Sequence, residues 1–115
     1  MPLIGIVGPC GAGKSTLIRG LEARGFRCRH IAQEHSYVPY MWQRISNPDV
    51  LIYLNASFQT CTSRRQLTWN QSDYAEQLHR LSHARQHADL TIETDDLSPA
   101  QVLETAALFL AEHHP

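Results

Sequence analysis

The sequence predicts an α/β fold, with about four parallel strands flanked by helices, in one domain covering residues 1–115. Two observations support this prediction. Short apolar runs of strand length recur along the chain, and segments with the 3.6-residue period of a helix separate them. No internal repeat, low-complexity segment or linker divides the chain. Strands that alternate with helices imply a parallel sheet with right-handed crossovers.

The first three elements are read from their apolar patterns. Residues 3–7 are continuously apolar and end at a glycine, which is typical of a strand buried on both faces. A helical segment follows from about Lys14, and Gly25 is a natural stop for it. Residues 26–31 alternate polar and apolar side chains, so we expect a more exposed strand at a sheet edge.

The second half continues the alternation. Residues 49–57 read as a buried strand, residues 72–88 as a helix and residues 89–94 as a last short strand. The apolar face expected for the long helix comprises Tyr74, Leu78, Leu81 and Ala88.

The final helix has a clear start. Ser98 can cap it, Pro99 suits its first turn, and Gln101 completes a capping box. In parallel sheets of this kind, ligands bind beyond the carboxyl ends of the strands.

Composition excludes several function classes. The formal net charge is -1 and no block of like charge occurs, so nucleic acid and membrane surfaces are not expected partners. Cys10, Cys28 and Cys61 are odd in number and lack metal-type spacing, which favours reduced thiols in a cytoplasmic protein. No apolar run reaches the ~20 residues of a membrane span, and the opening lacks a signal-peptide pattern.

The most specific signal is "GPCGAGKS", residues 8–15, which matches G-x-x-x-x-G-K-[ST], the P-loop motif, at every position. Its glycines let backbone N–H groups point at phosphate oxygens, and the following helix adds its positive end. Lys14, the chain's one lysine, would reach the β- and γ-phosphates from the surface of the loop, and the Ser15 hydroxyl would ligate Mg²⁺. A predicted strand precedes the motif and a predicted helix follows it, as this chemistry requires.

With these residues the chain resembles the small P-loop kinases, such as shikimate, adenylate and nucleoside kinases. The resemblance rests on "LIGIVGPCGAGKSTL", on "DVLIYLNAS" followed by an arginine pair, and on "HADLTIETDDLSPAQVLETAALFL". It implies a reduced P-loop scaffold for phosphoryl transfer, with a nucleotide, Mg²⁺ and a mobile lid.

The resemblance also implies roles for individual residues. Arg64 and Arg65 match the arginine pair that opens the lid, and Arg85 falls where a second phosphate-facing arginine is common. Residues 94–96, with Asp95 at their centre, match the loop beside the base. The positions that would hold the nucleotide phosphates are Gly8, Gly11, Ala12, Gly13, Lys14, Ser15 and Thr16.

The chain departs from this family in three respects. It is short, so the usual substrate domain and one strand-helix unit are missing between the second and third strands. No apolar strand ends in the aspartate that usually positions the metal. The lid is reduced to about residues 64–74.

Glu34 and His35 follow the second strand on the ligand side of the sheet. If that strand lies beside the first, Glu34 can orient Mg²⁺ through water or accept a proton from an acceptor hydroxyl. The alternative is a solvated loop carboxylate. His35 is either a proton carrier or substrate contact, or a plain loop histidine.

The aromatic segment 37–44 takes the place of the substrate domain. Tyr40, Trp42 and Arg44 can form a pocket for an anionic or ring-bearing acceptor. Alternatively, the segment covers the sheet with Trp42 in the core, or forms a self-association patch and hence a homodimer.

Several other side chains have plain alternatives. Arg64 and Arg65 either contact phosphate or end a helix as ordinary charges. Cys10 is expected to face away from the nucleotide. The histidines spaced four apart have metal-capable spacing, but a solvated helix face is favoured for them: His79, His83 and His87.

The favoured function is an ATP-dependent kinase acting on a small molecule, with Lys14, Glu34, Arg64 and Arg65 as its catalytic residues. The main alternative is a nucleotide-binding switch or interaction module that hydrolyses slowly and has no acceptor. An anion binder without turnover is a third reading. ATP is expected over GTP because no guanine-specific signature is visible.

Overall fold

The computed structural model describes residues 2–66 and 68–113. It shows an α/β fold with a four-stranded parallel sheet of order β2-β1-β3-β4, which confirms the predicted fold class. The strands are β1 (Leu3–Val7), β2 (Arg27–His30), β3 (Val50–Asn55) and β4 (Leu90–Glu93). Each lies within a residue or two of its predicted bounds.

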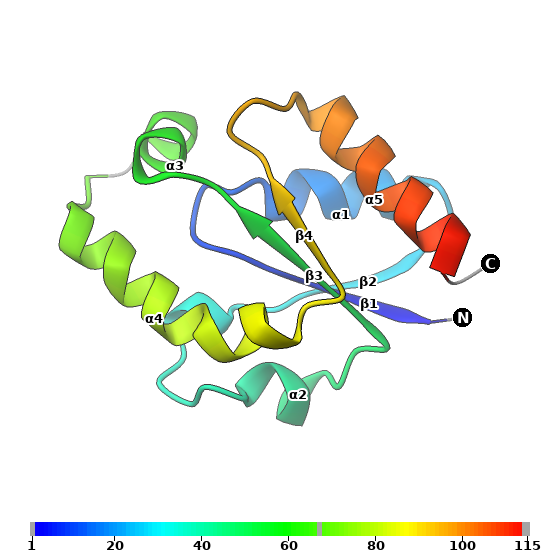
Figure 1. Ribbon diagram of the computed structural model, residues 1–115, viewed down its shortest axis with the longest axis horizontal. Coiled ribbons are helices and arrows are strands. Elements are labelled where there is room, and N and C mark those ends of the chain that lie inside the picture. The colour runs from blue at the N-terminus through cyan, green and yellow to red at the C-terminus, as the bar shows by residue number, and fades with distance from the viewer. Residues whose placement is uncertain (1, 67, 114–115) are drawn as a thin grey trace.

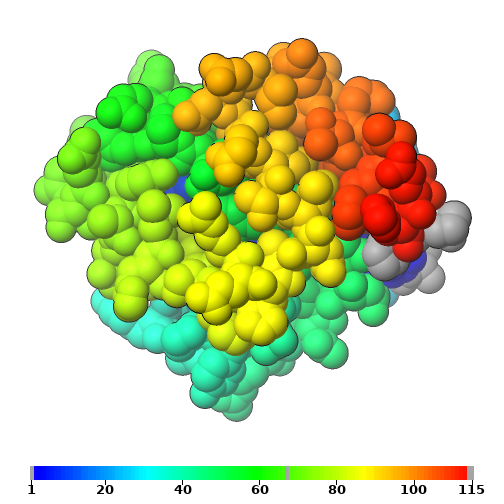
Figure 2. Space-filling model, viewed as in Figure 1, coloured from blue at the N-terminus to red at the C-terminus, as the bar shows by residue number. Residues whose placement is uncertain are grey.

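Helices cover both faces of the sheet (Figure 1). α1 (Lys14–Ala23) and α5 (Pro99–His113) pack on one face, and α4 (Gln71–His87) and the short α2 (Met41–Ile45) pack on the other. α3 (Phe58–Arg65) follows β3, and a 3₁₀ turn, η1 (Gln33–His35), follows β2. Figure 2 shows the side chains of α4 and β4 closing over one face of the molecule.

Alternation along the strands produces two separate cores. Ile4, Ile6 and Ile52 pack against α1 and α5, whereas Val7 and Tyr53 pack against α4 and α2. Successive side chains of a strand point to opposite faces, so a continuously apolar strand is what a sheet covered on both sides needs.

The helix ends confirm two of the predicted signals. Gly25, at φ 92°, ends α1, and the N–H of Phe26 donates to the carbonyl of Leu21, as in a Schellman motif. At α5, Ser98 Oγ accepts from the N–H of Gln101, and Gln101 Oε1 accepts from the N–H of Ser98. The predicted capping box is therefore present.

The topology positions the site. β2 pairs directly with β1, and β3 pairs with the other side of β1. The chain thus leaves β1 toward one side of the sheet and later returns to its other side. A ligand crevice is expected at such a switch point, beyond the carboxyl end of β1. Of the predicted lid, Leu67 lies outside the described residues.

Among the residues that the structure describes, no helix combines the length and apolar character needed to cross a membrane.

Candidate functional site

The motif loop leaves β1 at the switch point and leads into α1. Gly11 (φ 87°) and Gly13 (φ 101°) both have left-handed backbones that favour glycine. A Cβ at Gly11 would stand 2.5 Å from the carbonyl oxygen of Cys61, so α3 packs directly on the loop. A Cβ at Gly13 would meet no atom within 4 Å, so this side of the loop faces open space.

Lys14 is folded back into the loop. Its ammonium donates to the carbonyl oxygens of Gly8 (2.5 Å) and Pro9 (3.2 Å), and to Glu34 Oε2 (2.8 Å). Only 6% of Lys14 is exposed. The expectation that Lys14 lies at the surface of the loop is therefore wrong, because three acceptors draw the ammonium inward.

Glu34 lies where the sequence placed it, beyond the carboxyl end of β2 and next to the loop. It is buried, with 3% exposed, so it is not the solvated carboxylate of the alternative interpretation. Its Oε2 pairs with Lys14, whereas its buried Oε1 has no hydrogen-bond partner among the described residues. A buried polar atom without a partner is costly and often marks a site for a ligand, water or ion.

Two glutamines that sequence reasoning missed hold this arrangement together. Gln33 donates to the carbonyls of Val38 and Arg80 and accepts from the N–H of Trp42, which ties η1 to α4 and α2. Gln77 Oε1 accepts from the N–H of Cys10 at 3.0 Å and so ties the loop to α4. The position of Gln77 between Tyr74 and Leu81 on the apolar face was an available signal.

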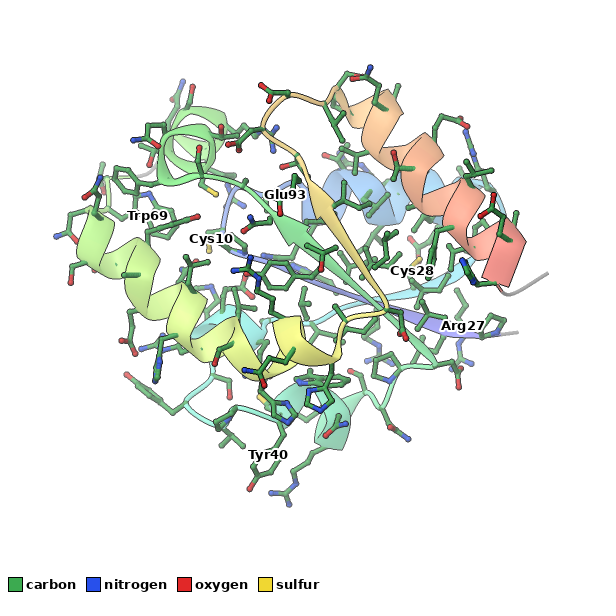
Figure 3. The ribbon with its side chains drawn as sticks, viewed as in Figure 1. Cys10, Arg27, Cys28, Tyr40, Trp69 and Glu93 are labelled. Atoms are coloured by element: carbon green, nitrogen blue, oxygen red, sulfur yellow. The ribbon has the colours of Figure 1, made fainter. Side chains whose placement is uncertain are left out.

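Cys10 and His35 join the same cluster. Cys10 Sγ lies 3.5 Å from His35 Nε2 and 3.9 Å from Glu34 Oε2, and His35 Nε2 lies 3.8 Å from Glu34 Oε2. Cys10 was expected to face away from the nucleotide, but it lines the cavity described next. In Figure 3, Cys10 lies between α4 and the carboxyl ends of the strands.

A cavity of about 600 Å³ surrounds the loop. Glu34 and His35 line one part of it, and the apolar Leu97, Pro99 and Val102 line another. The remaining lining residues are Cys10, residues 11–17, His30, Ala32, Arg64 and Arg65. The structure thus brings most of the predicted phosphate-contacting residues into one hollow.

The two arginines at the end of α3 differ in their contacts. Arg64 donates to the carbonyls of Ala12 and Thr94 and to Thr94 Oγ1, so it braces the loop against the segment after β4. Arg65 lines the cavity, and the structure gives it no ion pair among the described residues. Arg65 is thus the arginine whose donors remain available to a ligand.

The structure does not bring every predicted residue to the cavity. Arg85 lies on α4 over the ring of Tyr53, and Asp95 accepts from the N–H of Ser57; neither lines the hollow. Gly8 does not line it either, and its carbonyl accepts from Lys14. The backbone hydrogen bond from Ser57 lowers the pKa of Asp95.

The aromatic segment forms a layer of its own. Trp42 is 5% exposed and belongs to the core under α4, and its Nε1 donates to His83 Nδ1 at 3.1 Å. Tyr40, Trp42 and Arg44 do not line the cavity, and Figure 3 shows Tyr40 well away from Cys10. His79 and His87 are exposed, as the solvated helix face predicts, whereas His83 is half-buried and accepts from Trp42.

Burial also shifts the pKa values of two cysteines and of one histidine. Burial raises the pKa of Cys28 and of Cys61 to about 11, so both hold their thiol protons at neutral pH. Burial, assisted by the charge of Lys14, lowers the pKa of His30 below its ordinary 6.5, while Glu34 opposes the shift. A neutral imidazole at His30 is therefore favoured.

No family model matches the chain, and no curated protein matches it. Its function must therefore be inferred from the site itself.

Proposed function

We propose that this protein transfers a phosphoryl group from ATP to a small molecule. The observation that carries the proposal is the cavity lined by residues 10–17, where the loop, Lys14, Glu34 and Arg65 meet beyond the carboxyl end of β1. A nucleotide and an acceptor can share this hollow because it extends from the apolar Leu97 and Pro99 to Glu34 and His35. An apolar end of a cavity suits a flat base.

The loop is suited to bind phosphate. No partner is found among residues 2–66 and 68–113 for the N–H groups of Gly11 and Gly13, and α1 begins at Lys14. The first amides of a helix have no intrahelical acceptor, so they too are available to an anion. On binding, Lys14 would exchange its contact with Glu34 for a phosphate oxygen, which is a charge-assisted bond of the same kind.

Glu34 would then face the acceptor. Its carboxylate is buried beside the loop and can accept the proton of an attacking hydroxyl, with His35 next to it. Arg65 would contribute positive charge where charge develops on the transferring group. Mg²⁺, which the family resemblance implies, would be held by the exposed Ser15 hydroxyl and through water by Glu34, and would neutralise phosphate charge.

A second function has an observation in its favour. Because Tyr40, Trp42 and Arg44 do not line the cavity, the segment that replaces the substrate domain supplies no acceptor pocket there. This favours a nucleotide-binding switch that hydrolyses slowly and has no acceptor. Turnover with and without added acceptors separates the two functions.

The test compares two variants that both lack the Glu34 charge. Replacing Lys14 alone would leave Glu34 buried without its partner, which is costly, so Glu34→Gln is compared with Lys14→Met/Glu34→Gln. We expect Glu34→Gln to bind ADP·Mg²⁺ nearly as well as wild type but to transfer phosphoryl groups poorly. The double variant should bind about 10- to 100-fold more weakly than Glu34→Gln, since a charge-assisted contact contributes about 1.5–3 kcal/mol.

Calorimetry measures ADP binding, and ATP consumption with an acceptor screen measures transfer. Equal ADP affinity in the two folded variants would refute the phosphate role of Lys14. Tight ADP binding, with slow ATP hydrolysis that neither acceptors nor Glu34→Gln changes, would instead support the switch.

A further inference from the structure

We propose that Cys10, Glu34 and His35 form a binding site for a zinc-like divalent cation. Among residues 2–66 and 68–113, theirs is the one group of at least three potential metal-ligand side chains gathered closely enough to hold an ion. The site draws on the motif loop and on η1, which are separated by 24 residues in the chain.

The distances fit a metal of this class. Zinc bonds of about 2.3 Å to sulfur and about 2.0–2.1 Å to nitrogen and oxygen, at tetrahedral angles, separate the ligand atoms by about 3.3–3.6 Å. The observed separations are 3.5 Å for sulfur to nitrogen, 3.9 Å for sulfur to oxygen and 3.8 Å for nitrogen to oxygen. Contraction by a few tenths of an ångström completes three corners of a tetrahedron, and His35, which is exposed, has room to move.

The donor types select the class of ion. A thiolate and an imidazole are ligands for Zn²⁺ and similar transition metals, whereas Mg²⁺ and Ca²⁺ prefer oxygen alone. The Cys10 thiol would release its proton to solvent on binding. With three protein ligands, the fourth position opens on the cavity, where water can complete the coordination.

Independent contacts hold the ligands in place. Gln77 donates from Nε2 to Cys10 Sγ at 3.4 Å, and Gln33 fixes the turn that carries Glu34 and His35. The Glu34 oxygen near Cys10 and His35 is Oε2, which also accepts from Lys14, whereas the buried Oε1 lacks a partner. A rotation of the carboxylate would therefore let Lys14 keep one oxygen while a cation takes the other. Hydrogen bonds of this kind, made to the ligand residues and not to the metal, hold the ligands in the orientation that metal binding requires.

Other thiols and histidines of the chain are poorer candidates. Cys61 is fully buried, and Cys28 lies far from Cys10, toward the other end of the sheet (Figure 3). His83 and His87 have metal-capable spacing, but His83 Nδ1 accepts from Trp42 and His87 Nδ1 lies 2.8 Å from the carbonyl oxygen of His83.

One consequence rests on the proposed function. A Glu34 carboxylate bound to a cation cannot accept a proton from an acceptor, so zinc should inhibit transfer. The site itself does not depend on that function, because metal binding is measured without nucleotide.

The test titrates Zn²⁺ into the reduced, tag-free protein against a chromophoric chelator, and records the absorption spectrum with Co²⁺. We expect one ion per chain and, with Co²⁺, a thiolate-to-metal charge-transfer band. Cys10→Ser and His35→Gln each remove one metal ligand. Removal of a residue that only supports a ligand typically weakens metal binding by about 10- to 100-fold, so each variant should weaken Zn²⁺ binding by at least that factor. Cys28→Ser and His87→Gln are the matched controls and should bind like wild type.

Circular dichroism confirms that each variant is folded. Zinc binding that survives both Cys10→Ser and His35→Gln would overturn the proposal, as would a cobalt spectrum without the thiolate band. Loss of binding in His87→Gln but not in His35→Gln would assign the metal to the histidine stripe of α4 and would equally refute the site.

Discussion

Arg64 and Arg65 are adjacent in the chain but meet different surroundings. The guanidinium of Arg64 donates hydrogen bonds to Ala12 and Thr94 within the protein, whereas Arg65 lines the cavity. A fixed guanidinium braces the loop, whereas a free one can meet a ligand. The sequence could identify the pair but not divide these roles, because the division depends on which side of α3 the loop packs.

We expect different outcomes when each arginine is removed. Arg64→Ala should destabilise the fold by about 1–3 kcal/mol, since it leaves partly buried acceptors without a donor. Arg65→Ala should keep wild-type stability. It should lower the turnover of ATP more than the affinity for ADP, because the Arg65 guanidinium would stabilise charge that develops during transfer. Urea denaturation, calorimetry and steady-state rates measure the three quantities. Arg29→Ala, on an exposed part of β2, is the control, and identical profiles for the two test variants would contradict the division.

His30 reports the charges of the site through its pKa. Lys14 lowers that pKa and Glu34 raises it. Glu34→Gln should therefore lower it further, and adding Lys14→Met to Glu34→Gln should raise it again. NMR titration of the imidazole measures both shifts, and shifts of the same sign would contradict the assignment.

The same shift makes the stability of the protein depend on pH. Because the pKa of His30 is lower in the folded protein than the ordinary 6.5, the stability that His30 contributes is present above pH 6.5 and lost as the pH falls through the folded value.

At the scale of elements, two glycines of the loop between β1 and α1 have different surroundings. Gly11 packs against the backbone of Cys61, and Gly13 faces open space on the ligand side. Gly11→Ala combines left-handed strain of about 1–2 kcal/mol with a collision against the backbone of Cys61, so it should destabilise the protein more than Gly13→Ala. Gly13→Ala carries only the strain, but its methyl group would project into the space where phosphate is expected. It should therefore lose ADP binding while staying folded.

Urea denaturation and ADP calorimetry on the two variants check this contrast. A Gly13→Ala protein that binds ADP like wild type would show that the open side of the loop is not the phosphate site.

The elements that sequence reasoning found are the ones with strong periodicity. β1 and β3 are continuously apolar, and α5 has a capping box that can be recognised from the sequence. α2 was missed, and of α3 only the end at Arg64 and Arg65 was anticipated. Both helices are short and expose most of their side chains, with only Trp42 and Cys61 buried in them. The locations of Lys14 and Glu34 were predictable from the motif and the strand order, but their burial depends on Gln33 and Gln77, whose partners lie far along the chain.

At the scale of the whole molecule, the layer of α2 and α4 is separate from the cavity. Trp42 is buried in that layer, and its Nε1 is bonded to His83. In a Trp69→Phe background, the fluorescence of Trp42 should therefore not respond to ADP·Mg²⁺. A clear change in its emission would show that the layer moves with the site, and would restore residues 37–44 as candidates for acceptor binding.

The strand order also decides what this small sheet presents to other molecules. Its two outer strands are short. β2 exposes Arg27 and Arg29, and β4 exposes Glu93. Unpaired backbone groups on an outer strand invite a second chain to extend the sheet, and charged side chains oppose such growth. Two β2 edges would bring like positive charges together. The exposed β2, whose alternating pattern predicted a strand at a sheet edge, should therefore oppose edge-to-edge aggregation.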